Sequence, residues 1–446
     1  MNKKFIFIVG PTASGKTFIS EIISQKLNLP IVSVDSMQIY KEMDIGTAKP
    51  DFYSIKKFNY FGIDLVYPSS WFSAGDYYYY IKDLLEDKLK EGALFAGGSG
   101  LYYDAIMKGI SKVPPKSDAI RNELKDKANK LGLEELFNDL QKVDFDYAKK
   151  ISKSDEKRIL RALEVYYLTG KKFSSFHDND YFKKKSLNSL FNEEEIIVYG
   201  IKVDKDSNDL SIKKRLDLMF DKGFLDEAIN IFFKYPDKNK PAFKSIGYFH
   251  IFSVIYFLIF AEIFLFILKD SNLINSINYL INSINFLFNS NFKNLSNNIK
   301  KIYDRLLLIL KNFDFILKNN SEDELIQNFI DQFDFFYCDT YSTDFIYFFY
   351  EIGNKIFKLE NNKINLNFSF GDFSFKRDFE FETEKFSKKI KEIIQKNDFF
   401  WGTIKRRIVF DTIAFSKRQL KWFFKDKEII WLDKNDILSK FGLSLI

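Results

Sequence analysis

The motif that most constrains this chain is a glycine-rich loop close to its N-terminus. The apolar run Phe5–Val9 has the length of a buried strand, and the next residues, Gly10–Thr17, fit the pattern G-x-x-x-x-G-K-[ST]. Such a loop turns backbone N–H groups, and the N-terminus of the helix predicted over Lys16–Leu27, toward a phosphate group. The motif therefore predicts a polyphosphate site formed by Gly10, Pro11, Thr12, Ala13, Ser14, Gly15, Lys16 and Thr17, with Thr17 in the position of a Mg²⁺ ligand.

Length and composition limit the class of protein. The chain has 446 residues, enough for about three domains, and 46% of them are apolar. A net charge of +6 permits an anionic macromolecule as partner without requiring one. The single Cys338 excludes an intrachain disulfide, and two histidines, His177 and His250, leave little for a zinc site. We expect a cytoplasmic, zinc-free protein without a signal peptide.

Segments of strand length and helix length alternate over the first hundred residues. The alternation predicts a parallel sheet flanked by helices, that is, an α/β fold of the P-loop NTPase type. Asp35 follows the second strand, and a second glycine-rich turn, Gly97–Tyr102, follows a later one, so both belong to the sheet edge where ligands bind. The predicted strands are Ile31–Val34, Tyr60–Val66 and Ala93–Ala96, and the predicted helix is Ala74–Lys90.

From Ser117 to Phe176 the pattern becomes helical throughout, which predicts a helical insertion into the sheet domain. Strand character returns at Ile196–Val203, and two further helices are predicted over Leu210–Phe220 and Phe224–Phe233. Arg215 lies in the first of these helices. Its spacing alone favours a surface arginine, although it could also point back to the phosphate edge.

Residues 249–404 differ from the rest of the chain in composition, and we find no catalytic pattern in them. Ile251–Leu268 is nearly as long as a membrane span, but Glu262 interrupts it and no second span follows, so a buried helix is the favoured interpretation. A repeated Ile-Asn-Ser-Ile-Asn sequence within Leu273–Leu287 predicts a packing stripe, and alternation within Lys363–Phe381 predicts a hairpin.

Basic and aromatic residues occur together near the C-terminus. Lys405–Arg407 and Lys417–Phe423 are predicted to lie on one helix, followed by a strand over Glu428–Leu432. Such a combination is typical of nucleic-acid binding. A solvated basic helix with Trp422 in the core is an equally good interpretation of the composition.

Taken together, these motifs resemble those of the tRNA dimethylallyltransferase family, over residues 1–248 and about 405–433. The resemblance implies transfer of a dimethylallyl group from its diphosphate to N6 of adenine 37 in tRNAs that read codons starting with U, with Mg²⁺ as cofactor. The motifs that carry it are Gly10–Thr17, Val34–Tyr40, Met43–Pro50, Gly97–Tyr102, Asp155–Val165, Arg215–Phe224, Ser245–Tyr248 and Ser416–Phe423.

The resemblance also implies roles for individual residues. Thr17 would hold Mg²⁺ in part, and Arg215 would add positive charge at the diphosphate. The amine must lose a proton, and Asp35 is the candidate general base, with a helix cap or an outer-shell metal contact as its alternative. The helical segment 117–176 would grip the anticodon stem-loop. The residues matched to tRNA contacts are Asp35, Ser36, Met37, Gln38, Ser99, Arg121, Glu156, Lys157, Arg158, Ile159, Leu160, Lys417 and Arg418.

We expect five segments and a monomer that does not bind membranes. A P-loop small-molecule or nucleotide kinase is the alternative enzyme and would turn over ATP. A catalytically idle tRNA-binding or membrane-attached protein is the other alternative, although intact Lys16, Thr17 and Asp35 argue against it. The expected segments are the catalytic core over 1–116 and 177–248, the helical anticodon-binding insertion 117–176, the atypical insertion 249–404 and the basic C-terminal core segment 405–446.

Overall fold

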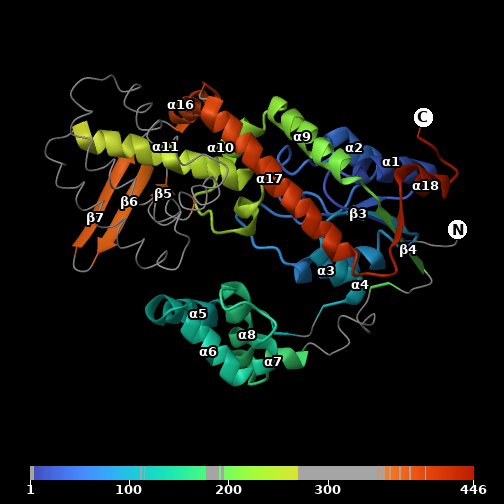
Figure 1. Ribbon diagram of the computed structural model, residues 1–446, viewed down its shortest axis with the longest axis horizontal. Coiled ribbons are helices and arrows are strands. Elements are labelled where there is room, and N and C mark those ends of the chain that lie inside the picture. The colour runs from blue at the N-terminus through green and yellow to red at the C-terminus, as the bar shows by residue number, and fades with distance from the viewer. Residues whose placement is uncertain are drawn as a thin grey trace. The chain divides into compact units, whose positions relative to one another are not determined.

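The computed structural model describes residues 5–110, 113–114, 116–176, 190–191, 195–269, 350, 357–360, 363–370, 373–380, 383–396 and 398–445 (Figure 1). Contacts between residues divide the chain into two compact units. The helical unit includes Ser73–Glu91 and Gly100–Ile196, and the sheet unit comprises Phe5–Phe72, Gly92–Ser99 and the chain from Ile197 onward.

The sheet unit is built on five strands in the order β2-β3-β1-β4-β8. β3 pairs in parallel with both β1 and β2, and β4 pairs in parallel with β8. Because the strands are parallel, the loops after β1, β2 and β3 lie at one edge of the sheet, as in other α/β folds. The predicted parallel α/β sheet is confirmed. Its strands are β1 (Phe5–Val9), β2 (Ile31–Val34), β3 (Ala93–Gly97), β4 (Ile196–Ile201) and β8 (Ile430–Leu432).

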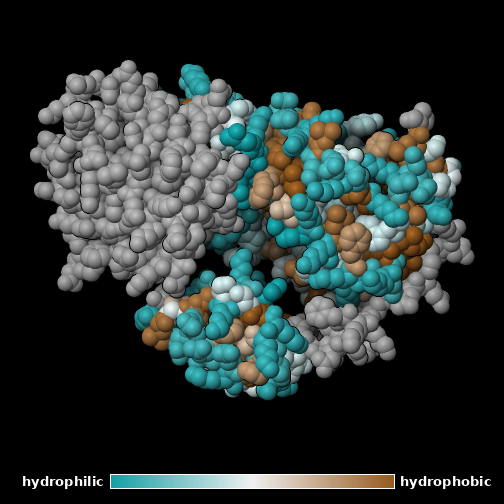
Figure 2. Space-filling model, in the orientation of Figure 1, coloured by the Kyte–Doolittle hydropathy of each residue, from teal (hydrophilic) through white to brown (hydrophobic). Residues whose placement is uncertain are grey.

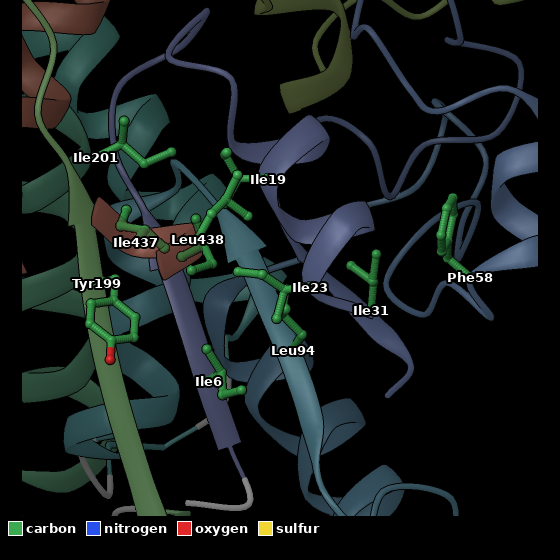
Figure 3. Packing of buried hydrophobic residues seen from close by; sticks show 11 residues of the cluster. Ile6, Ile19, Ile23, Ile31, Phe58, Leu94, Tyr199, Ile201, Ile437 and Leu438 are labelled. Atoms are coloured by element: carbon green, nitrogen blue, oxygen red, sulfur yellow. The ribbon is translucent and has the colours of Figure 1, made fainter. Parts of the chain in front are cut away.

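One face of the sheet is covered by α1 (Lys16–Leu27) and the short helix α18 (Lys434–Ser439). Figure 3 shows Ile23 of α1 beside Leu94 of β3, and both side chains are fully buried. Burying a side chain of this kind contributes about 1.5 to 3 kcal/mol. The strand and the helix predicted on either side of the glycine-rich loop are both confirmed.

The predicted strand Tyr60–Val66 is wrong. The segment makes only two isolated bridges, between Phe61 and Val32 and between Val66 and Tyr40. Asp64 interrupts it with a φ of 55°, a left-handed conformation that a strand cannot accommodate. The segment does run beside β2, because the N–H of Phe61 donates to the carbonyl of Ile31 and the carbonyl of Phe61 accepts the N–H of Ser33, both over 2.8 Å.

The helical unit has its own apolar core between α5, α6 and α8. Ser117 caps the N-terminus of α5, and Asp155 caps that of α8 by accepting the N–H of Arg158. The face of this unit shown in Figure 2 is mostly hydrophilic. The helical prediction for 117–176 is confirmed. The helices of the unit are α3 (Ala74–Glu86), α4 (Gly100–Lys108), α5 (Asp118–Leu131), α6 (Leu133–Val143), α7 (Phe145–Ala148), α8 (Glu156–Thr169) and the 3₁₀ turn η1 (Phe173–Phe176).

The rest of the sheet unit is mainly helical. The long helix α17 packs against α9 and α11, and α10 packs against the same two helices (Figure 1). The predicted hairpin is confirmed, because β6 and β7 are antiparallel, with β5 as a third strand. The remaining elements are α2 (Phe52–Lys57), α9 (Lys205–Asp221), α10 (Phe224–Lys234), the 3₁₀ turn η3 (Pro241–Lys244), α11 (Tyr248–Lys269), β5 (Phe357–Glu360), β6 (Lys363–Phe370), β7 (Phe373–Glu380), α16 (Thr383–Lys396) and α17 (Asp398–Phe423).

The apolar segment that begins at Ile251 lies in α11, and its side chains over residues 251–259 are buried. Within the described ranges, no helix is both long enough and apolar enough to cross a membrane. The stripe predicted within Leu273–Leu287, together with Cys338 and His177, lies outside the described residues.

Candidate active site

The loop after β1 has the geometry of an anion cradle. Lys16, the first residue of α1, donates a hydrogen bond from Nζ to the carbonyl oxygen of Pro11 over 2.6 Å. Burial, together with the charge of Arg215, lowers the pKa of Lys16 to about 7, although the charge of Asp35 opposes both. The hydroxyl of Ser14 is buried and has no hydrogen-bond partner among the described residues. An incoming phosphate oxygen would satisfy such groups.

The second glycine-rich turn lies directly beside the residues that follow β2. At Gly97 any Cβ atom would overlap the carbonyl oxygen of Val34, so only glycine allows this close approach. The N–H of Ser99 donates to the same carbonyl over 3.1 Å, and the Ser99 hydroxyl accepts the N–H of Ser36 over 2.9 Å. The predicted site residues Ser36 and Ser99 are therefore in contact.

Arg215, on α9, points toward the glycine-rich loop. Its Nη1 donates to the hydroxyl of Thr12 over 3.2 Å, and the side chain is half-buried. The surface interpretation favoured by its spacing is wrong. Burial lowers the pKa of Arg215 and Asp35 acts against this, but an arginine remains charged because its ordinary pKa is so high.

Asp35 stands at the carboxyl end of β2. Its Oδ1 accepts the N–H of Met37 over 2.8 Å, which orients the carboxylate. The nearby Gln38 points into the scaffold, where its Oε1 accepts the hydroxyl of Ser33 and its Nε2 donates to the carbonyl of Ala48. Asp35 lines both cavities of the site, whereas Gln38 lines one of them and binds the loop that contains Ala48.

Two cavities meet at Asp35. The phosphate cavity, about 320 Å³, is lined by the glycine-rich loop from Thr12 to Thr17. The apolar cavity, about 380 Å³, is lined by Ile212, Leu216 and Met219 of α9, among others. Both cavities are bordered by Thr12, Ala13, Asp35, Thr47, Arg215 and Phe415. A substrate with a diphosphate in one cavity can therefore present its other end to the second.

The residues matched to tRNA contacts fall into two groups. Glu156, Lys157 and Arg158 are exposed at the N-terminus of α8. Ile159 and Leu160 are buried in the core of the helical unit, so their side chains do not reach the surface. The helical phase of α8 explains the difference, because it turns residue 158 outward and residue 159 inward.

Arg121 is engaged inside the protein. Its Nε and Nη2 each donate to the buried carboxylate of Glu164 over 3.0 Å, and Arg161 and the N–H of Ser117 bind the same carboxylate. The guanidinium of Arg121 is therefore occupied by an ion pair within the helical unit.

Near the C-terminus, Lys417 and Arg418 are exposed on α17, and Arg418 also borders the apolar cavity. Trp422 is 38% exposed, so the interpretation that placed it in the core is wrong. Lys425 lies 5.5 Å from the centre of its ring.

Two residues that support the site were not predicted. Gln419 lies in the matched motif Ser416–Phe423, and its Nε2 donates to the carbonyl of Gly98 over 2.8 Å. Glu227, on α10, binds the backbone of the loop that follows β2. Their positions in the sequence give no signal of this, because each binds a partner more than 180 residues away.

Several known proteins are similar to this chain. The family model for IPP transferases matches residues 38–265. The tRNA dimethylallyltransferase of Natranaerobius thermophilus is 42% identical over 231 residues, which are 51% of this chain and 67% of that protein. The tRNA dimethylallyltransferase of Thermosipho africanus is 40% identical over 253 residues, 55% of this chain and 78% of that one. The crystal structure of the tRNA isopentenylpyrophosphate transferase from Bacillus halodurans aligns over 99% of this chain and 94% of that one, with 20% identity and a TM-score of 0.43.

Proposed function

The chain belongs to the tRNA dimethylallyltransferase family, and we propose that it transfers a dimethylallyl group from dimethylallyl diphosphate to N6 of adenosine 37 in tRNAs that read codons starting with U. The observation that supports this most directly is the position of Asp35, which borders both the phosphate cavity and the apolar cavity. We also expect a cytoplasmic monomer.

The donor side rests on the phosphate cavity. Backbone N–H groups of the glycine-rich loop, Lys16 and Arg215 bind the diphosphate and stabilise the negative charge that grows on it as the allylic C–O bond breaks. The hydrogen bond from Arg215 to Thr12 places the guanidinium at the same end of the loop. The five-carbon group then extends toward the apolar cavity.

Mg²⁺ fits this cavity chemically. The hydroxyl of Thr17 and the carboxylate of Asp35 both line it, and Mg²⁺ prefers such oxygen ligands together with phosphate oxygens and water. When bound, the ion would add positive charge at the leaving group, with Thr17 as the ligand we assign to it.

The acceptor side requires loss of one proton. As the exocyclic nitrogen forms a bond to the allylic carbon and the diphosphate leaves, Asp35 takes the proton from the nitrogen. Its Oδ1 is already oriented by the N–H of Met37, so Oδ2 is the oxygen we assign to the amine. Adenine must leave the anticodon-loop stack to reach this position.

Recognition of tRNA rests on exposed charge. We assign phosphate contacts to Lys157 and Arg158 on α8, and to Lys417 and Arg418 on α17. Arg121, Ile159 and Leu160 stabilise the helical unit that carries the first pair.

The test is a direct assay of the product. Purified protein, Mg²⁺, dimethylallyl diphosphate and tRNA are incubated, and the nucleosides are analysed by mass spectrometry for adenosine enlarged by one dimethylallyl group. Arg215→Ala should lose most of the activity, while Lys214→Ala, an exposed residue on the same helix, should keep it. Turnover of ATP without any modified adenosine would instead favour the kinase alternative.

A further inference from the structure

The loop after β2 forms one side of the passage between the two cavities. Gly46 borders the apolar cavity, and Thr47 borders both cavities. We call these two residues the loop wall. Asp35 and Arg215 line the same two cavities, so the position of the loop wall helps to set the space available to the reacting groups.

The loop wall is held from α10 by one carboxylate. Oε2 of Glu227 accepts the N–H groups of Asp44, over 2.9 Å, and Ile45, over 2.8 Å. Oε1 accepts the N–H of Gly46 over 2.9 Å and the hydroxyl of Tyr248. Four donors from two separate segments thus converge on a single side chain.

Each oxygen of the Glu227 side chain accepts two hydrogen bonds. A carboxylate accepts hydrogen bonds on both oxygens, and hydrogen bonds to a charged acceptor are about twice as strong as those between neutral groups. Burial and the neighbouring Glu227 raise the pKa of Tyr248 well above its usual value, so the phenol keeps its proton and acts as a donor.

Packing leaves the loop no room to move closer to α10. A Cβ atom at Gly46 would overlap the rings of Phe224 and Tyr248, which themselves meet edge to face at 5.1 Å. Elsewhere in the loop, Lys49 donates to the carbonyl of Tyr40 and to the carboxylate of Asp44. Glu227 is therefore the side chain that binds the backbone N–H groups of residues 44 to 46.

We infer that Glu227 is a positioning residue of the transfer reaction, which fixes the loop wall so that the acceptor nitrogen and the allylic carbon meet in line beside Asp35. The inference rests on the proposed function. It predicts a loss in kcat rather than in tRNA binding, because the exposed charges assigned to tRNA lie on other elements. Misplacement of a reacting group by about 1 Å can cost about 10²-fold in rate.

Glu227→Gln is the central variant. Glutamine keeps the shape of the side chain but has one acceptor oxygen. It can therefore accept either the N–H groups of Asp44 and Ile45 or the N–H of Gly46 and the hydroxyl of Tyr248, but not both pairs. The control is Asp226→Asn, which removes the same charge from the neighbouring position. Asp226 is half exposed and pairs with Lys391 over 2.5 Å, a surface ion pair of little energetic weight.

We expect Glu227→Gln to lower kcat by about 10²-fold. The Kd for tRNA should stay within about twofold of wild type, and the Asp44–Gly46 amides should exchange hydrogen faster. Asp226→Asn should match wild type in kcat, in the Kd for tRNA and in amide exchange.

A kcat within twofold of wild type in folded Glu227→Gln would overturn the inference, as would a loss of kcat matched by an equal loss of tRNA binding. If Glu227→Gln unfolds at the assay temperature, Glu227→Asp, which keeps the charge but not the reach, is judged by the same criteria. If wild type lacks transferase activity, the proposed function fails, while amide exchange still reports whether Glu227 holds the loop.

Discussion

Gln419 binds the glycine-rich loop from the opposite end of the chain: its Oε1 accepts the backbone N–H of Thr12 over 2.8 Å. The same side chain donates from Nε2 to the carbonyl of Gly98, so one amide group joins the two glycine-rich turns. Gln419 is 7% exposed and lines the phosphate cavity. The helix α17 thereby completes the lining of the phosphate cavity. The lining residues outside α17 all precede residue 216.

Replacing this amide by a carboxylate should impair donor binding. Gln419→Glu loses the hydrogen bond to Gly98 and places a negative charge beside the diphosphate. We expect KM for dimethylallyl diphosphate to rise at least tenfold, because the lost neutral hydrogen bond contributes about 0.5 to 1.5 kcal/mol and the new charge also repels the diphosphate. Lys421→Gln changes the net charge by the same amount at an exposed position of α17 and should leave KM unaltered. Equal KM values in the two variants would contradict the role assigned to Gln419.

The parts of the fold and site that could be predicted are those with a local pattern. β1, the glycine-rich loop and α1 were predicted with their bounds because strand, turn chemistry and helix periodicity follow one another there. The pattern of α9 favours a surface position for Arg215, because local spacing does not reveal that this side chain reaches the loop after β1. The contacts of Glu227 and Gln419 depend on tertiary pairing, which no periodicity encodes, and the turn at Asp64 depends on a single left-handed residue.

The general base can be tested without altering the shape of the site. Asp35→Asn still offers an oxygen to the N–H of Met37 but cannot accept a proton from the amine. We expect kcat to fall by about 10² to 10⁴, the usual contribution of a general base, with tRNA binding unchanged. Asp51→Asn is the matched control, because asparagine replaces aspartate well at the N-cap of α2. Wild-type turnover in Asp35→Asn would rule out this assignment.

Arg158 should contribute one phosphate contact. It is exposed on α8 and its Nη1 lies 3.4 Å from Asp155, which leaves the guanidinium accessible. We expect Arg158→Gln to weaken tRNA binding and to reduce the slope of log Kd against log salt concentration by about one. Lys125→Gln, an exposed charge on α5, serves as the comparison in the same titration. A slope identical to wild type would show that Arg158 does not touch a phosphate.

Arg121 should behave differently from Arg158, although resemblance matched both to tRNA contacts. Burial acts to raise the pKa of Glu164, but hydrogen bonds from Arg121 and Arg161 hold it below its usual value, so the carboxylate is charged and needs its partners. Removing one partner of a buried ion pair costs about 3 to 5 kcal/mol, and with Arg161 still present we expect about 3 kcal/mol for Arg121→Gln. Thermal unfolding should show this loss, while Arg158→Gln should stay within about 0.5 kcal/mol of wild type. A stable Arg121→Gln with weakened tRNA binding would reverse the two roles.

His250 should make the stability of the protein depend on pH. Its Nδ1 accepts the N–H of Gly247 over 3.2 Å and its Nε2 lies 2.9 Å from Asp411, which also binds Arg407. Burial lowers the pKa of His250, Asp411 opposes this and Arg407 adds to it. Because the folded protein then binds a proton less readily than the unfolded chain, whose histidine pKa is about 6.5, the free energy of unfolding should fall as pH drops below about 6.5, by at most about 1.4 kcal/mol per pH unit. His250→Gln keeps a donor toward Asp411 but does not titrate, so its melting temperature should fall less between pH 7.5 and 5.5. Parallel pH profiles for the two proteins would show that His250 does not govern this response.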